Sequence, residues 1–235
     1  ARSGSKGIPG KNFQDLAGFP LLSWIVAAAK GSALDEVYIS TDDPDAAQRA
    51  VGPGLTHSGP PPVAILTRPA ELSQDDTPDL PVFSYVVVKL NLTEGDILVH
   101  LRPTSPFVQP QEIDEVVRQL LGAPSSVESV RSVRPAREHP AKMYREDKGR
   151  LWPWDSQEHL PNHPRQLLEP AFIAAGFVDA VRAGRILDGD MQGAHGFILA
   201  WPAPEDRTID LDTEGDWAAA ERLAKRHGWT PGQIG

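Results

Sequence analysis

The first twelve residues, ARSGSKGIPGKN, combine three glycines with three cationic side chains. Glycine lets backbone amides approach an anion closely, and successive amides can form a nest for a phosphate group. Arg2, Lys6 and Lys11 would add positive charge for several phosphate oxygens. The spacing is not that of a Walker A loop, because Ser5 stands where its first glycine belongs and Asn12 follows the lysine. Two interpretations stay open: a phosphate-binding loop or a basic, solvent-exposed terminus.

Two carboxylates lie two positions apart in the segment IDLD, at Asp210 and Asp212. If this segment is a strand, both side chains point to one face, with their Cα atoms roughly 6–7 Å apart. Such a pair can hold a hard cation such as Mg²⁺, which prefers oxygen ligands and also binds phosphates. Leu211 would then face the core. The alternative is an exposed strand with two surface acids.

Two other polar segments each follow a predicted strand. LRPTSP brings Arg102, Thr104 and Ser105 to the carboxyl end of one strand, which is where open α/β sheets bind ligands. Arg68 follows another strand and could donate hydrogen bonds to a base carbonyl. The alternatives are an ordinary proline-flanked turn and a surface arginine.

The elements that must position these residues alternate between strands and helices. β-Branched and apolar runs predict strands, whereas segments with acidic starts and glycine ends predict helices. Strands are expected at 36–41, 63–67, 96–101, 126–133, 170–181 and 207–212, and helices at 20–30, 42–52, 79–92, 111–122 and 213–228. This alternation implies parallel pairing and an α/β sandwich.

The pattern changes after Val133. The segment 142–154, KMYREDKGRLWPW, predicts a hairpin around Asp147-Lys148-Gly149, and a polar stretch follows it. We interpret this region as an excursion from the sheet and a candidate dimerisation arm. The length of 235 residues fits one domain that carries such an excursion.

Composition narrows the classes of partner. The formal net charge of −9 gives no basic footprint for nucleic acid, so an anionic ligand would need a local cationic pocket. The absence of cysteine excludes disulfides and thiolate metal sites and fits a reducing cytoplasm. No run approaches the ~20 apolar residues of a membrane span. We therefore expect a cytoplasmic protein with no nucleic-acid and no membrane partner.

Taken in order, the segments ARSGSKGIPGKN, VYISTDD, RPAELSQDDT, LRPTSP, HPRQ and IDLDTEGDWAAAE resemble the acylneuraminate (CMP-sialic acid synthetase-like) cytidylyltransferase family. The resemblance implies a three-layer α/β/α sandwich of the nucleotide-diphospho-sugar transferase type, which is Rossmann-like and has a mostly parallel sheet. It also implies a small protruding segment at 139–168, for dimerisation or the sugar site, and a homodimer. The implied reaction transfers CMP from CTP to the anomeric hydroxyl of a nine-carbon, sialic-type (nonulosonic) acid, releases pyrophosphate and requires Mg²⁺.

The same resemblance implies a role for each matching residue. The residues implied to contact the nucleotide are Arg2, Ser5, Lys6, Lys11, Asn12 and Arg68. Those implied to contact the sugar acid are Arg102, Thr104, Ser105 and Arg165. The implied Mg²⁺ ligands are Asp210 and Asp212. Lys11, Arg2 and Asp212 are the implied catalytic residues, with Lys11 neutralising charge at the α-phosphate. The general base stays open.

The chain departs from the family pattern in two places. Arg102 stands where many members carry Gln, and 175–179 reads AGFVD where members often have Asn-Gly-Ala-Ile-Tyr. N-Acetylneuraminic, legionaminic and pseudaminic acids therefore all stay open as acceptors. A 3-deoxy-manno-octulosonate cytidylyltransferase and an inactive nucleotide-binding scaffold are the alternatives. Because the opening loop should follow a central strand, we also expect a β-strand before residue 1.

Overall fold

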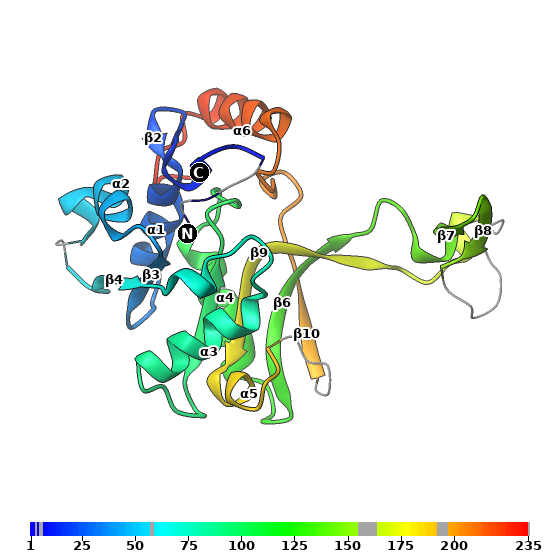
Figure 1. The fold of residues 1–235 in the computed structure, drawn as a ribbon, viewed down its shortest axis with the longest axis horizontal. Coiled ribbons are helices and arrows are strands. Elements are labelled where there is room, and N and C mark those ends of the chain that lie inside the picture. Colours follow the sequence, from blue (N-terminus) through cyan, green and yellow to red (C-terminus); the bar gives the residue numbers. More distant parts are fainter. Residues whose placement is uncertain (3, 5–6, 57–58, 155–163, 192–196, 235) are drawn as a thin grey trace.

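The computed structural model describes the chain apart from residues 3, 5–6, 57–58, 155–163, 192–196 and 235, and the side chains of 53, 54, 56 and 165 (Figure 1). The described helices are α1 (Leu21–Gly31), α2 (Pro44–Thr56), α3 (Asp79–Lys89), α4 (Pro110–Leu121), α5 (Ala183–Leu187) and α6 (Glu214–His227). The described strands are β1 (Asp15–Leu16), β2 (Phe19–Pro20), β3 (Val37–Thr41), β4 (Val63–Thr67), β5 (Ile97–Leu101), β6 (Val127–Pro135), β7 (Tyr144–Asp147), β8 (Arg150–Pro153), β9 (Phe172–Arg182) and β10 (Phe197–Pro202).

The larger sheet has the strand order β10-β6-β9-β5. β10 runs parallel to β6, whereas β9 runs antiparallel to both β6 and β5. β5, β6 and β10 therefore share one direction, and β3 and β4 form a separate parallel pair. The predicted, mostly parallel α/β sheet is confirmed. β9 is the exception because β6 leaves the sheet toward the arm and β9 returns from it, which makes the two strands an antiparallel ribbon.

Helices cover the larger sheet on both faces. One core cluster joins α1, α2 and α4 to Val178 and Ala180 of β9. A second cluster joins Val87 of α3 and Ile186 of α5 to Val181. Because side chains alternate along a strand, Asp179 points to the same face as Val181. The predicted three layers are thus present, and Asp179 lies on the α3 side.

The segment before α6 is not a strand, so the prediction of one at 207–212 is wrong. Leu211 donates its backbone amide to the carbonyl of Thr104, at 3.0 Å, instead of joining a ladder. Its side chain is fully buried in a third cluster with Trp24 and Phe107. The expected inward direction of Leu211 is confirmed, and this residue attaches the loop to the body of the protein between its two acids.

The start of α6 follows the predicted capping pattern. Thr213 accepts a hydrogen bond from the amide of Asp216, whose carboxylate accepts in turn from the backbone and hydroxyl of Thr213. The helix ends at Gly228, whose φ of 64° is left-handed. This capping box fixes the chain direction directly after Asp212.

A groove of about 950 Å³ separates β3 from β5 and is lined largely by apolar side chains of α1, α3, β3 and β5. Among the described residues, β3 pairs with β4 and β5 pairs with β9, each on its far side. The backbone nitrogen of Ala1 donates to the carbonyl of Ser40, at 2.8 Å. The opening loop therefore begins at the carboxyl end of β3. The strand expected before residue 1 stays a prediction.

β6 and β9 extend far beyond the sheet as a ribbon that ends in the β7–β8 hairpin (Figure 1). Lys148 and Gly149 form its tip with φ values of 50° and 77°, which suits a tight two-residue hairpin turn. The predicted hairpin and excursion are confirmed. Large apolar side chains on the arm are exposed: Met143, Tyr144, Leu151, Trp152, Trp154, Leu167, Phe172 and Ile173. In the described part of the chain, no helix is long and apolar enough to cross a membrane.

Candidate active site

A cavity of about 380 Å³ lies where the opening loop, the segment after β5 and the segment before α6 meet. Its lining is Arg2, Gly4, Gly7, Lys11, Asn12, Asp79, His100, Arg102, Pro103, Thr104 and Asp212. Six of these residues were predicted from the sequence: Arg2, Lys11, Asn12, Arg102, Thr104 and Asp212. The structure therefore brings together segments that lie at the beginning, middle and end of the chain.

Lys11 connects the opening loop to the acidic segment. Its Nζ lies 3.1 Å from Oδ1 of Asp212 and also donates to the carbonyl of Leu211. The Lys11 side chain is 12% exposed, whereas that of Asp212 is 70% exposed. The ammonium is thus fixed from one side, and the carboxylate remains accessible to a ligand.

The opening loop is held in place by its own backbone and by a close approach to Asp212. Asn12 is buried and donates from Nδ2 to the carbonyl of Arg2, at 2.9 Å. The Arg2 guanidinium lies 2.5 Å from Asp75. At Gly7, an added Cβ would lie 2.5 Å from the carbonyl oxygen of Asp212. Glycine is required at this position because nothing larger fits. These contacts hold the described residues Arg2, Gly7 and Asn12 against the protein, which favours a binding loop over a loose basic terminus.

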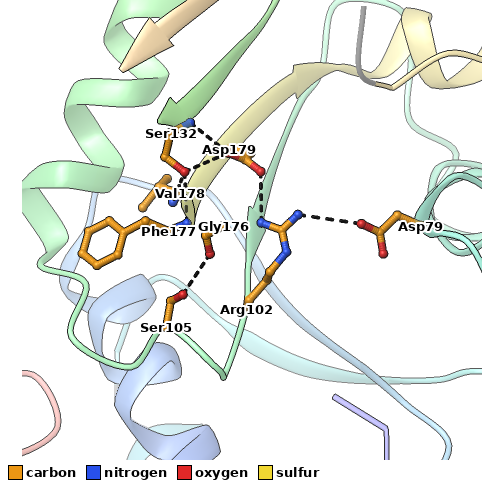
Figure 2. Close-up of polar contacts among 8 residues, drawn as sticks. All are labelled: Asp79, Arg102, Ser105, Ser132, Gly176, Phe177, Val178 and Asp179. Atoms are coloured by element: carbon orange, nitrogen blue, oxygen red, sulfur yellow. Dashed lines mark hydrogen bonds and ion pairs between the residues drawn. The ribbon is translucent and has the colours of Figure 1, made fainter. Parts of the chain in front are cut away.

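Arg102 follows β5 and lines the cavity together with Thr104. Figure 2 shows its guanidinium between Asp79 and Asp179. Its guanidinium forms ion pairs with Asp179, at 3.0 Å, and with Asp79, at 3.7 Å. Asp79 is the first residue of α3, a position that favours an acid near the positive end of the helix dipole. Asp179 lies within β9, its side chain is 16% exposed, and Arg102 is its cationic partner.

The lining carries three cations, Arg2, Lys11 and Arg102, and two carboxylates, Asp79 and Asp212. The lining thus places cations around a cavity in a chain whose net charge is −9, and Asp75 and Asp179 pair with Arg2 and Arg102 from outside the lining. His100 lies beside Phe83, with ring centroids 4.7 Å apart. Burial lowers the pKa of His100 well below its ordinary value, and the charge of Arg102 lowers it further. His100 is thus a neutral group at physiological pH.

Several predicted residues lie outside this lining. Ser105 is buried and donates from Oγ to the carbonyl of Gly176, at 3.0 Å. Its hydroxyl supports the Gly176 turn, and its predicted contact with substrate stays a prediction. Asp210 is exposed and does not line the cavity. Its backbone carbonyl accepts from the amide of Asp212, at 3.1 Å, a tight turn that replaces the predicted strand geometry.

Arg68 lies in the adjoining groove, which it lines together with Arg2. It donates from Nε to the hydroxyl of Ser73, at 3.1 Å. Burial lowers the pKa of the Arg68 guanidinium, while the nearby charge of Asp42 opposes that effect. Ser5 and Lys6 lie outside the described residues. Arg165 begins the short helical turn Arg165–Leu167, and its side chain is also outside the description.

Sequence reasoning missed four residues that shape the site: Gly7, Asp79, His100 and Asp179. The sequence did contain a signal for Asp179. An acid inside the apolar run of β9 requires a buried partner, because an unpaired buried charge is costly. The sequence did not identify that partner as Arg102.

Comparison with known proteins identifies the family. A family model described as cytidylyltransferase matches residues 1–148. The chain belongs to the cytidylyltransferase family. It is 27% identical to N-acylneuraminate cytidylyltransferase B from Danio rerio over 97% of this chain and 51% of that protein. The chain thus spans about half the length of that relative.

A bacterial relative has nearly the same length as this cytidylyltransferase chain. The CMP-N,N'-diacetyllegionaminic acid synthase of Legionella pneumophila is 28% identical over 95% of this chain and 93% of its own. A solved CMP:2-keto-3-deoxy-manno-octonic acid synthetase complexed with CTP superposes with a TM-score of 0.65 at 16% identity, over 96% of both chains. That likeness supports the nucleotidyltransferase fold.

Proposed function

We propose that this protein transfers CMP from CTP to the anomeric hydroxyl of a nonulosonic, sialic-type acid and releases pyrophosphate. The observation that carries the proposal is the meeting of Lys11, Arg2 and Asp212 with Arg102 and Thr104 around one cavity. The first three residues suit a triphosphate, and the last two suit an acidic sugar. The names of the two relatives described above support a sialic-type (nonulosonic) acceptor.

The residues of the cavity would act mainly by alignment and charge. The acceptor hydroxyl attacks the α-phosphorus, a new O–P bond forms, and the bond from that phosphorus to the oxygen bridging to the β-phosphate breaks. Pyrophosphate leaves with that electron pair, and the hydroxyl proton passes to solvent or to the base that stays open. Lys11 would stabilise charge on the α-phosphate oxygens, and Arg2 would bind the leaving phosphates. Gly4 and Gly7 let the loop backbone approach the triphosphate. Positioning of both substrates in line supplies a large part of the acceleration.

We also propose Mg²⁺ as the cofactor. Within the described part of the chain there is no group of three or more His, Cys, Asp or Glu placed to hold a metal. Asp212 fits as a ligand because its exposed carboxylate lines the cavity. Asp210 is exposed but lies outside the lining, and its role as the second ligand stays a prediction. Mg²⁺ takes its other ligands from water and substrate phosphates. When bound, the ion would supply positive charge to phosphate oxygens.

The base site is proposed in the groove beside Arg2. Arg68 and Arg2 both line this groove, and the fork of Arg68 can donate to both O2 and N3 of cytosine. Uracil shares O2 but carries an N–H at N3, so it cannot accept both hydrogen bonds. Arg68→Ala should then reduce the preference for CTP over UTP. Unchanged discrimination between the two nucleotides would remove Arg68 from the base site.

We propose that the protein is a homodimer held through the arm. Trp152, Trp154, Leu151 and Phe172 are exposed on a thin ribbon that cannot bury them against its own domain (Figure 1). Aromatic and large apolar side chains in such a position are typical of a protein interface.

Pyrophosphate release with CTP across a panel of acids tests the activity. The panel comprises N-acetylneuraminate, legionaminate, pseudaminate and 3-deoxy-manno-octulosonate. We expect release with a nine-carbon acid, and its complete dependence on the acid and on Mg²⁺. Preference for the eight-carbon acid would favour the octulosonate alternative. No release with any acid would favour a nucleotide-binding scaffold. Asp212→Ala should abolish Mg²⁺-dependent release. Asp210→Ala tests the second predicted ligand, and an unchanged rate in that variant would remove Asp210 from the metal site.

A further inference from the structure

The guanidinium of Arg102 lies between two carboxylates (Figure 2). Nη1 of Arg102 is 3.0 Å from Oδ2 of Asp179, and Nη2 is 3.7 Å from Oδ2 of Asp79. Arg102 and Asp79 line the cavity, whereas Asp179 does not. Asp179 therefore contacts the guanidinium from the side of the sheet, away from any ligand in the cavity.

Asp179 is itself held in one orientation. Its Oδ1 accepts hydrogen bonds from the backbone amide and the hydroxyl of Ser132, at 2.9 and 3.0 Å. Ser132 is fully buried, and its Oγ accepts from the amides of Phe177 and Val178. Because Ser132 occupies Oδ1, the other oxygen of Asp179 faces Arg102.

The backbone next to Asp179 also limits the position of Arg102. Gly176 has a φ of 64°, and its carbonyl accepts from the hydroxyl of Ser105, at 3.0 Å. A Cβ added at Gly176 would lie 3.7 Å from Cδ and from Nη1 of Arg102. The side chain of Arg102 thus rests against a turn that Ser105 and Ser132 fix from two sides.

We propose that Asp179 is a positioning residue that orients Arg102 toward the carboxylate of the acceptor and so sets the preference for an acidic sugar. The proposal rests on the proposed function. Arginine has five N–H donors in a rigid plane, and Asp179 accepts from Nη1. Asp79 lies 3.7 Å from Nη2, beyond hydrogen-bond distance, and no described residue accepts a hydrogen bond from Nε. A planar carboxylate in the cavity can therefore accept hydrogen bonds from these two nitrogens.

A carboxylate is needed at residue 179 because both of its oxygens act as acceptors. Asparagine of the same size offers one acceptor oxygen and a donor, so it cannot serve Ser132 and Arg102 together. Asp179→Asn removes one negative charge as well. If Asp179 only neutralised Arg102, this variant would bind an anionic acceptor more tightly. If Asp179 positions Arg102, the variant binds it more weakly. The two roles therefore predict opposite signs.

The test compares Asp179→Asn, Arg102→Gln and the double variant in pyrophosphate release, with the acid that gives the best turnover. We expect Asp179→Asn to raise the KM for the acid about tenfold, with kcat and the KM for CTP within about twofold. The double variant should match Arg102→Gln alone, because the two residues act as one unit. A lower KM for the acid, or additive effects, would overturn the proposal.

Glu128→Gln is the matched control. Glu128 pairs with Arg185 at 2.9 Å, and its side chain is 15% exposed, compared with 16% for Asp179. It lies outside the cavity lining, so its loss tests the effect of breaking a half-buried ion pair. We expect Glu128→Gln to leave the KM for the acid unchanged. An equal rise of the KM for the acid in Glu128→Gln and Asp179→Asn would show that the effect comes from breaking an ion pair and not from positioning Arg102.

A second measurement is independent of turnover. Modification of Arg102 by phenylglyoxal, followed by mass spectrometry of its peptide, should be several-fold faster in Asp179→Asn than in the natural chain. Unchanged reactivity would show that Asp179 does not hold the guanidinium. If the natural chain turns over no acid, the proposed function is wrong, and so is the proposal that Arg102 binds the carboxylate of the acceptor. If the natural chain turns over an acid and Asp179→Asn has the same KM for that acid, only the positioning role of Asp179 is contradicted, and the proposed function stands.

Discussion

Nζ of Lys11 lies 3.1 Å from Oδ1 of Asp212, although 201 positions separate the two residues in the chain. The contact joins a cation suited to phosphate with a carboxylate suited to a hard cation. It also places the opening loop against the segment before α6. The Lys11 ammonium is thereby oriented before any nucleotide arrives.

Lys11→Ala tests this relationship. We expect kcat/KM for CTP to fall by a factor of about 10² to 10³, because a fixed charge at the reacting phosphate is lost. Thermal unfolding should change little, since the pair is partly exposed. Lys30→Ala is the control, because Lys30 also donates to backbone carbonyls, those of Gly59 and Pro61, but lies outside the cavity. Equal activities of the two variants would contradict the role of Lys11.

Gly7→Ala should disturb both the loop and Asp212. The added Cβ would lie 2.5 Å from a backbone oxygen, so one of the two segments must move. We expect the free energy of unfolding to fall by about 1–3 kcal/mol and the rate of pyrophosphate release to fall about tenfold or more. Urea denaturation and initial rates measure the two effects. Gly95→Ala is the control, because an added Cβ there meets nothing within 4 Å.

His100 should make the folded state less stable at acidic pH. Burial lowers the folded-state pKa of His100 well below its ordinary value, so the unfolded chain binds this proton first as the pH falls below about 6.5. We expect a loss of up to about 2 kcal/mol in the free energy of unfolding between pH 7 and pH 5. His100→Asn should reduce the slope of stability against pH in this range. An unchanged slope would show that His100 titrates normally in the folded protein.

Thr213→Ala should weaken the start of α6. It removes the hydroxyl that caps the amide of Asp216, which typically costs about 1 kcal/mol. Hydrogen bonds from Thr213 also lower the pKa of Asp216, so the cap is present at neutral pH and is lost as the pH falls through that lowered pKa. Thermal unfolding should show a fall in Tm of about 2–4 °C. Ser125→Ala, at an exposed turn, should leave Tm unchanged.

Replacement of Trp152 and Leu151 by serine tests the arm. If the arm forms the interface, the double variant should elute as a monomer in size-exclusion chromatography with light scattering. Its thermal unfolding should otherwise resemble that of a folded domain, because both side chains are exposed. Leu121 on α4 and Leu187 on α5 are equally exposed outside the arm, and serine there should leave the mass unchanged. A dimer that survives the arm variant would place the interface elsewhere.

Many helix ends and strands could be predicted because the signals for them come from residues that are neighbours in the sequence. Glycine ends, acidic helix starts and β-branched runs located α1, α4, α6, β3 and β4 within a few residues. The direction of β9 could not be predicted, because apolar alternation carries no information on strand direction. The prediction of a strand at 207–212, before α6, failed for another reason. Its alternating pattern is that of a strand, but the amide of Leu211 bonds to the carbonyl of Thr104, far away in sequence.

The site was predictable where chemistry alone decides which groups belong together. Cations of the opening loop and the carboxylate of Asp212 both suit a triphosphate, and the cavity contains both. Ser105 and Asp179 show the limit of this reasoning. A serine after a strand can face a ligand or the backbone, and only packing directs Ser105 to Gly176. The two departures at Arg102 and Asp179 looked independent in sequence, yet they form one ion pair.

β9 runs from Phe172 on the arm to Arg182, past Asp179, with one irregularity in its register to β6 near Gly176. The strand therefore constrains which insertions and deletions the chain tolerates. Added residues at the hairpin tip, around Lys148 and Gly149, would leave every side chain of β9 on its face. Removal of one residue from β9 would turn either the arm or Asp179 to the opposite face of the sheet. Length variation is thus compatible with the far end of the arm and incompatible with the strand that supports it.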